Sequence, residues 1–379
     1  MVRPFEVNGR YLDKLNERQR DFLLTAIGLK FYQKFLTQHG KHLFIFGTTG
    51  SGKTQKGYAF VDWLKHLENQ IWFDTGKTNE ILPLLCMDRK IRIIVPKGHR
   101  VVIEEGKHKI PNPPQVIEVA TPYDALSALA TGSWDASKHK VRDTITIVSV
   151  RNAFQDKTKA VLWVEDFFEQ LAIRCRESTM PNIFPASLHL DESQWAMAGR
   201  RISGEGERTR AAEIITENAL ELRSAGIRLV LYAQSYTNIP PAARENMLFN
   251  VMCRGASVKS DENGNLSKWC NFSEKGNAIN PMHFSAKQGR FVFEDGESYP
   301  VRTPWNFQLY PLDEENRRWI KHLRVRYEGK NDMRGEETES EEECLPELGR
   351  FSAMAIPPDK QDTVFNRFCA ESAGEIDNE

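Results

Sequence analysis

The stretch that decides the fold of this chain reads Leu43-Phe44-Ile45-Phe46-Gly47-Thr48-Thr49-Gly50-Ser51-Gly52-Lys53-Thr54. Its first four residues are an apolar run of the length and type that forms a buried strand. A glycine-rich loop follows, and the next segment, Gln55 to Phe60, contains no proline and can open a helix. The stretch therefore predicts a strand, a tight loop and a helix in immediate succession.

Residues 47–54 fit the pattern of a phosphate-binding loop, in which a glycine and four further residues precede Gly-Lys-Thr. Glycines let the backbone turn tightly and point N–H groups inward, and the positive end of the following helix attracts phosphate oxygens. Lys53 would bring a mobile charge to the β- and γ-phosphates, and the Thr54 hydroxyl would ligate Mg²⁺. The sequence thus predicts Mg²⁺ and a nucleotide, the latter bound by Gly47, Thr48, Thr49, Gly50, Ser51, Gly52, Lys53 and Thr54.

The composition is that of an ordinary globular protein of 379 residues. The formal net charge of −1 gives no global signal for nucleic acid, so such binding would need a local patch or a ring channel. The most apolar early segment, Phe22 to Leu36, contains Lys30 and Lys34 and cannot span a bilayer. With no signal peptide at the start, we expect a cytoplasmic protein without a membrane segment. The six scattered cysteines are expected to be free thiols: Cys86, Cys175, Cys253, Cys270, Cys344 and Cys369.

A second motif follows another apolar run, Ser187 to Leu190, which leads directly into Asp191 and Glu192. A strand that ends in Asp-Glu is the expected partner of a phosphate-binding loop. Asp191 would hold the Mg²⁺, and Glu192 would polarise the attacking water as a general base. His189, in the middle of this strand, is more typical of a buried structural histidine than of a ligand.

Three other features leave alternatives open. Gln234 closes the expected strand Ile227 to Ala233, and it either senses the γ-phosphate or is an ordinary strand-end residue. Asp74 either caps a helix that runs to Leu85 or lies near the nucleotide at the end of a second parallel strand. The basic run over residues 89–109 is a solvated face by default, with a strip for phosphate backbones as the alternative.

The residues before Gln234 resemble a known superfamily. Six positions are similar to the Arg-Ala-x-Gly-Ile-His-Leu…Gln stretch of the HerA/FtsK superfamily: Arg223, Ala225, Gly226, Ile227, Leu229 and Gln234. That superfamily contains DNA-pumping motors, conjugative coupling proteins, viral packaging ATPases and the zonula-occludens-toxin-like ATPases of filamentous phages. The resemblance covers residues 40–300. It departs from the translocase pattern at Asn250 and at Ser235-Tyr236.

This resemblance implies a RecA-like three-layer αβα P-loop NTPase, with a mostly parallel sheet and antiparallel edge strands. It also implies a ring, usually a hexamer, with ATP at the subunit interfaces. Such sites need a cation from the neighbouring subunit to stabilise charge on the γ-phosphoryl group. Arg223 is the first candidate and Arg254 the second, although Arg223 can also be read as an exposed helix-end arginine. The loop of glycines and arginines over residues 199–210 would contact a neighbour or DNA, or is simply solvated.

The chain divides into four expected segments. Residues 1–40 form an N-terminal helical segment, and residues 41–312 form the P-loop ATPase domain. Residues 313–334 are predicted to be a helix rich in arginine and lysine. Residues 335–379 are an acidic linker and a tail, largely disordered, because the glutamate block at 335–343 cannot bury itself. The tail is apolar enough for a short helix that docks on a protein partner or on its own ring.

The sequence as a whole predicts Mg²⁺-dependent hydrolysis of ATP with Lys53, Glu192, Gln234 and Arg223 in catalytic roles. The expected work is moving DNA through an oligomeric ring, in viral genome packaging or in plasmid transfer. Two alternatives remain. One is a virion-assembly or secretion ATPase that acts on protein, and the other is a nucleotide-binding switch with no motor activity.

Overall fold

The computed structural model describes residues 7–76, 80–87, 89–104, 113–135, 140–141, 144–154, 156–177, 185–196, 206–256, 273–274, 277–278, 281–285, 288–302 and 324–329. All of these belong to one compact unit, which ends at Lys330. The predicted acidic linker and tail, residues 335–379, lie outside the described part of the chain. Among the described helices, none combines the length and hydrophobicity that a bilayer crossing requires.

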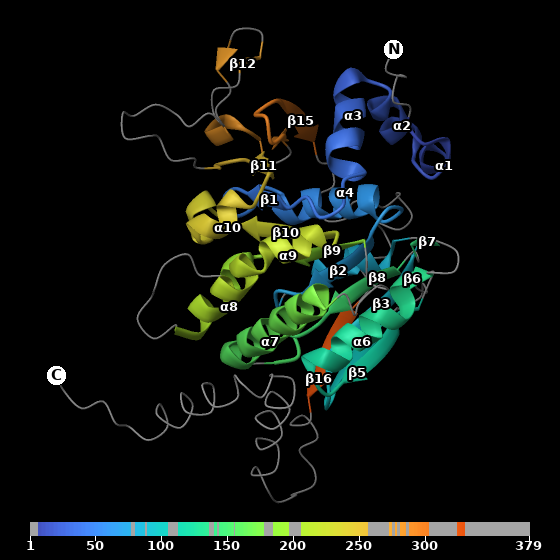
Figure 1. The fold of residues 1–379 in the computed structure, drawn as a ribbon, viewed down its shortest axis with the longest axis vertical. Coiled ribbons are helices and arrows are strands. Elements are labelled where there is room, and N and C mark those ends of the chain that lie inside the picture. Colours follow the sequence, from blue (N-terminus) through green and yellow to red (C-terminus); the bar gives the residue numbers. More distant parts are fainter. Residues whose placement is uncertain are drawn as a thin grey trace, which may run out of the picture. The chain divides into compact units, whose positions relative to one another are not determined.

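Ten strands of the described residues form one sheet in the order β15-β14-β11-β1-β10-β9-β2-β8-β3-β5 (Figure 1). From β11 to β5 all neighbours run parallel, and only β14 and β15 at one edge run antiparallel. The bounds of these ten are β1 Leu43–Phe46, β2 Asn69–Phe73, β3 Lys90–Pro96, β5 Gln115–Val119, β8 Thr144–Val148, β9 Ala186–Leu190, β10 Ile227–Ala233, β11 Phe249–Cys253, β14 Gln288–Val292 and β15 Ser298–Arg302. The predicted fold, a mostly parallel α/β sheet with antiparallel edge strands, is confirmed.

The remaining strands form two-stranded sheets outside the main one. They are β4 His99–Glu104 with β16 Arg324–Gly329, β6 Trp134–Asp135 with β7 Lys140–Val141, and β12 Ser273–Glu274 with β13 Asn277–Ala278. The helices are α1 Gly9–Leu12, α2 Glu17–Leu23, α3 Ala26–Phe31, α4 Lys53–Leu64, α5 Leu82–Leu85, α6 Pro122–Ser133, α7 Lys157–Arg176, α8 Gly206–Glu217, α9 Ala219–Ser224 and α10 Pro241–Glu245. A π-helical turn at Tyr32–Leu36 extends α3, and 3₁₀ turns occupy Ser193–Trp195, Tyr236–Asn238 and Pro281–His283.

Two hydrophobic clusters lie on opposite faces of the sheet, because side chains alternate along each strand. Leu43 and Ile45 of β1 belong to one cluster together with apolar residues of α1–α4, and Phe44 and Phe46 belong to the other with α6–α10. Figure 1 shows α6, α7 and α8 next to one another on that second face. The central strands β1 and β10 are therefore buried on both faces, which explains why they read as largely apolar runs.

The N-terminal segment packs onto the helix that follows the phosphate-binding loop. Tyr11 donates a hydrogen bond to the Trp63 carbonyl at 2.8 Å, and Gln19 Nε2 donates to Asp62 Oδ2 at 2.9 Å. A capping box formed by Asn16 and Gln19 begins α2, as expected when an Asn precedes a Gln by three residues. This segment thus completes the cluster on the α4 face.

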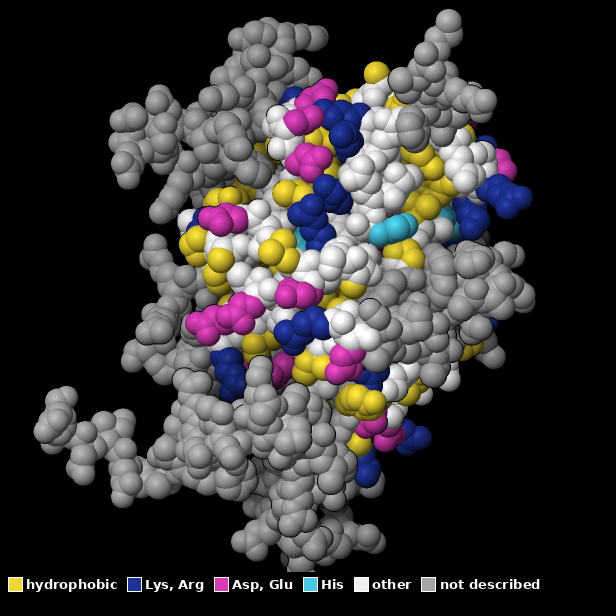
Figure 2. Space-filling model, viewed as in Figure 1, with side chains coloured by type: hydrophobic (Ala, Val, Ile, Leu, Met, Phe, Trp, Pro, Cys, Tyr) yellow, Lys and Arg dark blue, Asp and Glu magenta, His cyan; other side chains and the backbone are white. Residues whose placement is uncertain are grey.

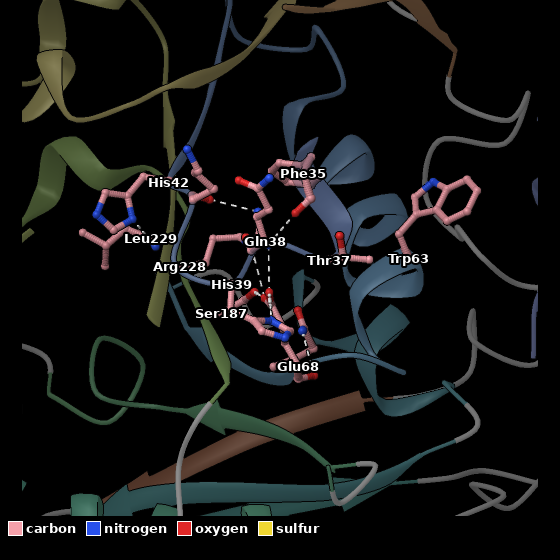
Figure 3. A network of polar contacts seen from close by, with 12 residues as sticks. Phe35, Thr37, Gln38, His39, His42, Trp63, Glu68, Ser187, Arg228 and Leu229 are labelled. Atoms are coloured by element: carbon pink, nitrogen blue, oxygen red, sulfur yellow. Dashed lines mark hydrogen bonds and ion pairs between the residues drawn. The ribbon is translucent and has the colours of Figure 1, made fainter. Parts of the chain in front are cut away.

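At the amino ends of the central strands, Arg228 and Glu68 form a buried ion pair (Figure 3). Arg228 Nη2 lies 2.8 Å from Glu68 Oε1 and its Nε donates to Oε2 at 3.1 Å. Ser187 also donates to Glu68, and His39 Nδ1 lies 3.0 Å from Glu68 Oε1. Three backbone carbonyls accept the other guanidinium bonds: Phe35, Gln38 and Lys41. This network joins the starts of β2, β9 and β10 and the segment before β1.

Two sequence predictions are wrong in the described residues. The predicted helix over residues 313–334 is a strand at Arg324–Gly329, paired antiparallel with β4. Here Val325 is buried and Arg324 and Arg326 are exposed, so the period is that of a strand. The predicted loop over residues 199–210 is helical from Gly206, where α8 begins and packs against α7.

Candidate phosphate-binding site

The phosphate-binding loop connects β1 to α4, as the sequence predicts. It lies where the parallel strands end, which we call the carboxyl edge of the sheet; the amino edge is where these strands begin. Gly50 and Gly52 have φ angles of 74° and 75°, a left-handed backbone that residues with side chains adopt at a cost. Gly52 is the N-cap of α4, and its carbonyl accepts the Lys56 N–H at 3.0 Å. The loop therefore delivers its backbone to the positive end of a 12-residue helix.

Both neighbouring strands hold the start of this loop. The Gly47 N–H donates to the carbonyl of Ala233, the last residue of β10, at 3.2 Å. The N–H and hydroxyl of Thr48 donate to the carbonyl of Arg254, just after β11, at 3.0 and 3.1 Å. Gly255 is pressed against Thr48 so closely that a Cβ there would lie 2.5 Å from its methyl carbon. Thr48 is thus fixed between two strand ends.

Lys53 bends back over the loop that precedes it. Its ammonium donates to the carbonyls of Gly47 at 2.9 Å and Thr48 at 3.1 Å, and the residue is only 9% exposed. The charge is therefore held directly above the loop, within the reach of phosphate oxygens bound there.

The two sequence motifs meet at a single hydrogen bond. Thr54 Oγ1 donates to Asp191 Oδ2 at 2.8 Å, and the other carboxylate oxygen accepts the Glu192 N–H at 2.9 Å. Asp191 is fully buried at the end of β9. A hydroxyl and a carboxylate are the oxygen donors that Mg²⁺ prefers, so Thr54 and Asp191 fit the ion that the sequence predicts.

Glu192 has an unusual backbone. Its φ of 45° is the only positive value of a non-glycine residue in the described ranges. The turn that imposes it is held on both sides, because Ser193 Oγ donates to the Tyr232 carbonyl at 2.8 Å and Trp195 Nε1 to the Asp191 carbonyl at 3.2 Å. Strain of this kind is common where a side chain has to serve chemistry.

The other predicted residues lie at the carboxyl edge and at the amino edge of the sheet. Gln234 is exposed and directly follows Ala233, so it lies beside the first residue of the loop. Arg254 is exposed and lies at the same edge, next to Thr48. Arg223 lies at the opposite edge, where α9 ends before β10 begins and its carbonyl packs on Gly40. The structure therefore brings Gln234 and Arg254 to the loop and leaves Arg223 away from it.

His189 and Asp74 have structural partners. His189 Nδ1 lies 2.7 Å from the Tyr232 hydroxyl and Nε2 lies 2.9 Å from Gln70 Oε1, and burial lowers its pKa to about 3. This confirms a buried structural histidine. Asp74 accepts hydrogen bonds from the N–H groups of Arg151 and Asn152 in the loop after β8, instead of capping a helix. Burial raises the pKa of Asp74 to about 6, although these bonds favour its charged form.

The sequence analysis missed two features of the site. One is the β11 end, where the Arg254 carbonyl and Gly255 hold Thr48, because nothing in the sequence pairs β11 with β1. The other is Lys56, which is fully buried and donates to the Ser51 carbonyl at 3.1 Å. No local signal in the sequence marks this burial, because it depends on the approach of Gly289 from a distant strand.

No protein-family model and no curated protein matches this chain. Solved structures do resemble its fold. The genome packaging NTPase of Sulfolobus turreted icosahedral virus 2, in complex with ATP-gammaS, is 12% identical over 70% of this chain and 98% of its own, with a TM-score of 0.38.

Two further solved structures, both described as ATPases, are similar to a comparable degree. EccC of Thermomonospora curvata (ATPases 2 and 3) is 14% identical over 75% of this chain and 41% of its own, with a TM-score of 0.38. EssC of Geobacillus thermodenitrificans (ATPases 2 and 3) is 13% identical over 74% of this chain and 43% of its own, with a TM-score of 0.37. At these identities and TM-scores the similarity carries no argument about function, so what this chain does has to follow from the residues of its own site.

Proposed function

We propose that this chain is an ATP-hydrolysing motor of the HerA/FtsK type that moves DNA through an oligomeric ring. The observation that carries the nucleotide chemistry is the 2.8 Å contact between Thr54 Oγ1 and Asp191 Oδ2. It joins the phosphate-binding loop to the acidic strand end and sets a hydroxyl and a carboxylate where one Mg²⁺ can bind both.

Each residue of the site has a role in this proposal. The loop amides and Lys53 would hold the phosphates, and Thr54 and Asp191 would hold Mg²⁺, which would supply charge neutralisation for the phosphates. Glu192 orients the attacking water and accepts its proton. Gln234, beside Gly47 at the end of β10, contacts the γ-phosphate and reports its loss to that strand.

Ring assembly is part of the proposal because of where Arg223 lies. At the opposite edge of its own sheet, it can stabilise the γ-phosphoryl group only of a neighbouring subunit. Arg254 lies against the phosphate-binding loop of its own subunit, so we assign the role in trans to Arg223 alone.

DNA as the substrate rests on the HerA/FtsK-like stretch from Arg223 to Gln234. The described side chains of the face in Figure 2 show basic and acidic groups interspersed, without one broad basic area. With a formal net charge of −1 as well, we place DNA contact in the channel of the ring, where several copies contribute cations to one path.

The test is the ATPase rate per subunit against protein concentration, with and without double-stranded DNA. The wild type should speed up with concentration and with DNA, and Arg223→Ala should lose about 10²-fold in rate. Arg176→Ala, at the exposed end of α7, is the matched control and should behave as wild type. Mixing Arg223→Ala with Lys53→Ala should restore activity, because each subunit supplies what the other lacks.

Other results would redirect the proposal. Hydrolysis that ignores DNA but responds to a partner protein would favour a virion-assembly or secretion ATPase. Nucleotide binding with no turnover, and with function intact in Glu192→Gln, would indicate a switch without motor activity. A rate that is flat with concentration and indifferent to Arg223 would contradict the ring.

A further inference from the structure

Lys56 is a charged side chain buried in an unusual way. It lies in the first turn of α4, it is 0% exposed, and it is one of the largest fully buried side chains among the described residues. In the described part of the chain its ammonium donates one hydrogen bond, to the Ser51 carbonyl at 3.1 Å, and no carboxylate pairs with it. Buried lysines without a counter-charge are rare, because removing an ammonium from water is costly.

The fold makes room for this lysine. Gly289 on β14 faces the Lys56 stem, and a Cβ at that position would lie 2.5 Å from Lys56 Cε and 3.2 Å from the Met252 carbonyl. A glycine in a sheet interior weakens the strand and often marks a close approach. Here it lets the side chain pass between α4 and the sheet and end beneath the phosphate-binding loop, at Ser51.

The position is also unfavourable for a cation on helical grounds. Lys56 is in the amino-terminal part of α4, where the helix dipole and unpaired N–H groups already create positive potential. Lys53 adds a second charge only one turn away. The positive groups at this loop repel one another, and the negative charge of a phosphate bound there would offset part of that repulsion.

We infer that Lys56 is a positioning residue whose counter-charge is the polyphosphate of the nucleotide bound in the loop. Lys56 contacts the loop at the Ser51 carbonyl, whereas Lys53 contacts it at the carbonyls of Gly47 and Thr48. The inference deepens the proposed function and rests on it. Because attraction grows with the charge of the ligand, Lys56 should favour a triphosphate over a diphosphate and a diphosphate over a monophosphate.

The experiment measures the Kd of the wild type and of Lys56→Met for a non-hydrolysable ATP analogue, ADP and AMP. Methionine keeps the length and fills the space without charge. The affinity for the ATP analogue should fall about 10-fold, which is about 1.4 kcal/mol, with a smaller loss for ADP and none for AMP. Lys56→Gln should match Lys56→Met, because charge rather than the hydrogen bond to Ser51 carries the effect. Lys90→Met, at an exposed site, is the control.

The folded state provides a second measurement. Without nucleotide, Lys56→Met should be at least as stable to heat as the wild type, because a buried unpaired charge has been removed. With the ATP analogue its Tm should rise less than that of the wild type. Equal affinities in Lys56→Met and wild type, or equal losses for all three nucleotides, would overturn the inference.

A further variant covers the case in which Lys56→Met does not fold. Gly289→Ala crowds the lysine without changing any charge, and it should weaken binding of the ATP analogue more than binding of AMP. An unchanged ratio of the two affinities would contradict the inference. If the wild type itself bound no nucleotide, the proposed function would fail first, so the two failures are distinguishable.

Discussion

Charged side chains are buried at both the amino edge and the carboxyl edge of the central sheet, but they differ in whether an opposite charge pairs with them. At the amino edge, Arg228 and Glu68 are fully buried and paired through two hydrogen bonds, and backbone carbonyls accept the remaining guanidinium bonds (Figure 3). At the carboxyl edge, Lys56 is equally buried, and among the described residues its ammonium has a single carbonyl as its hydrogen-bond partner. The charges of Arg228 and Glu68 balance each other, whereas no carboxylate of the described residues pairs with Lys56.

The contrast shows how burial and function can be told apart. A buried pair in which each group satisfies the other is a feature of folding, and its loss should appear as a loss of stability. A buried cation beside a phosphate-binding loop is a feature of binding, and its loss should appear in affinity. Variants at the two edges should therefore change different observables.

The largest effect is expected at the amino edge. Glu68→Gln leaves Arg228 buried without its counter-charge, so the free energy of unfolding should fall by about 3–5 kcal/mol. Urea unfolding measures this directly. Glu294→Gln removes a surface acid 3.1 Å from Lys41 and should cost less than about 1 kcal/mol. Similar losses in the two variants would mean that the buried pair adds nothing beyond a surface pair.

Acid should also act at the amino edge, through His42. Its Nε2 lies 2.8 Å from the Ala219 carbonyl and its Nδ1 accepts the Leu229 N–H at 3.0 Å. Burial, with the charges of Arg228 and Arg223, lowers the pKa of His42 from 6.5 to about 4. A neutral buried histidine supports the fold above pH 6.5, and this support is lost as the pH falls towards 4.

The comparison with His42→Gln isolates this contribution. Between pH 7 and pH 4 the stability of the wild type should fall by about 3 kcal/mol more than that of the variant. Burial raises the pKa of Glu68, but Arg228 and His39 lower it further, to about 2. Protonation of Glu68 therefore does not contribute to the loss of stability above pH 4.5. Parallel stability curves for wild type and variant would contradict a neutral His42.

The third effect belongs to the carboxyl edge and should appear chiefly in turnover. Thr54→Val removes the hydroxyl that contacts Asp191, so kcat should fall about 10²-fold, or about 2.7 kcal/mol. The free energy of unfolding should fall by about 1–3 kcal/mol, because the buried Asp191 carboxylate loses a hydrogen-bond donor. Thr54→Ser retains the hydroxyl and should keep most of the activity. Equal activity in the valine and serine variants would separate Thr54 from Mg²⁺ binding.

Local signals in the sequence predicted much of this structure. The loop at 47–54 could be predicted because its glycines directly follow an apolar run. The Asp-Glu end of β9 could be predicted because its two acids also directly follow an apolar run. The helix predicted over residues 313–334 is wrong at Arg324–Gly329, because pairing with β4, more than 200 residues earlier, fixes that segment as a strand. The burial of Lys56 was equally hidden, since it depends on Gly289 in a distant strand. Contacts between remote segments are what composition and periodicity do not encode.

The backbone of Glu192 sets stability against activity in this protein. With φ at 45°, the position suits glycine or asparagine, and a glutamate there costs about 1 kcal/mol or more. Selection for higher thermal stability would therefore favour Glu192→Gly or Glu192→Asn. Either variant would lack the base that the proposed hydrolysis needs. Stability and turnover thus make opposite demands on this residue, so Glu192 should be kept unchanged when more stable variants are engineered.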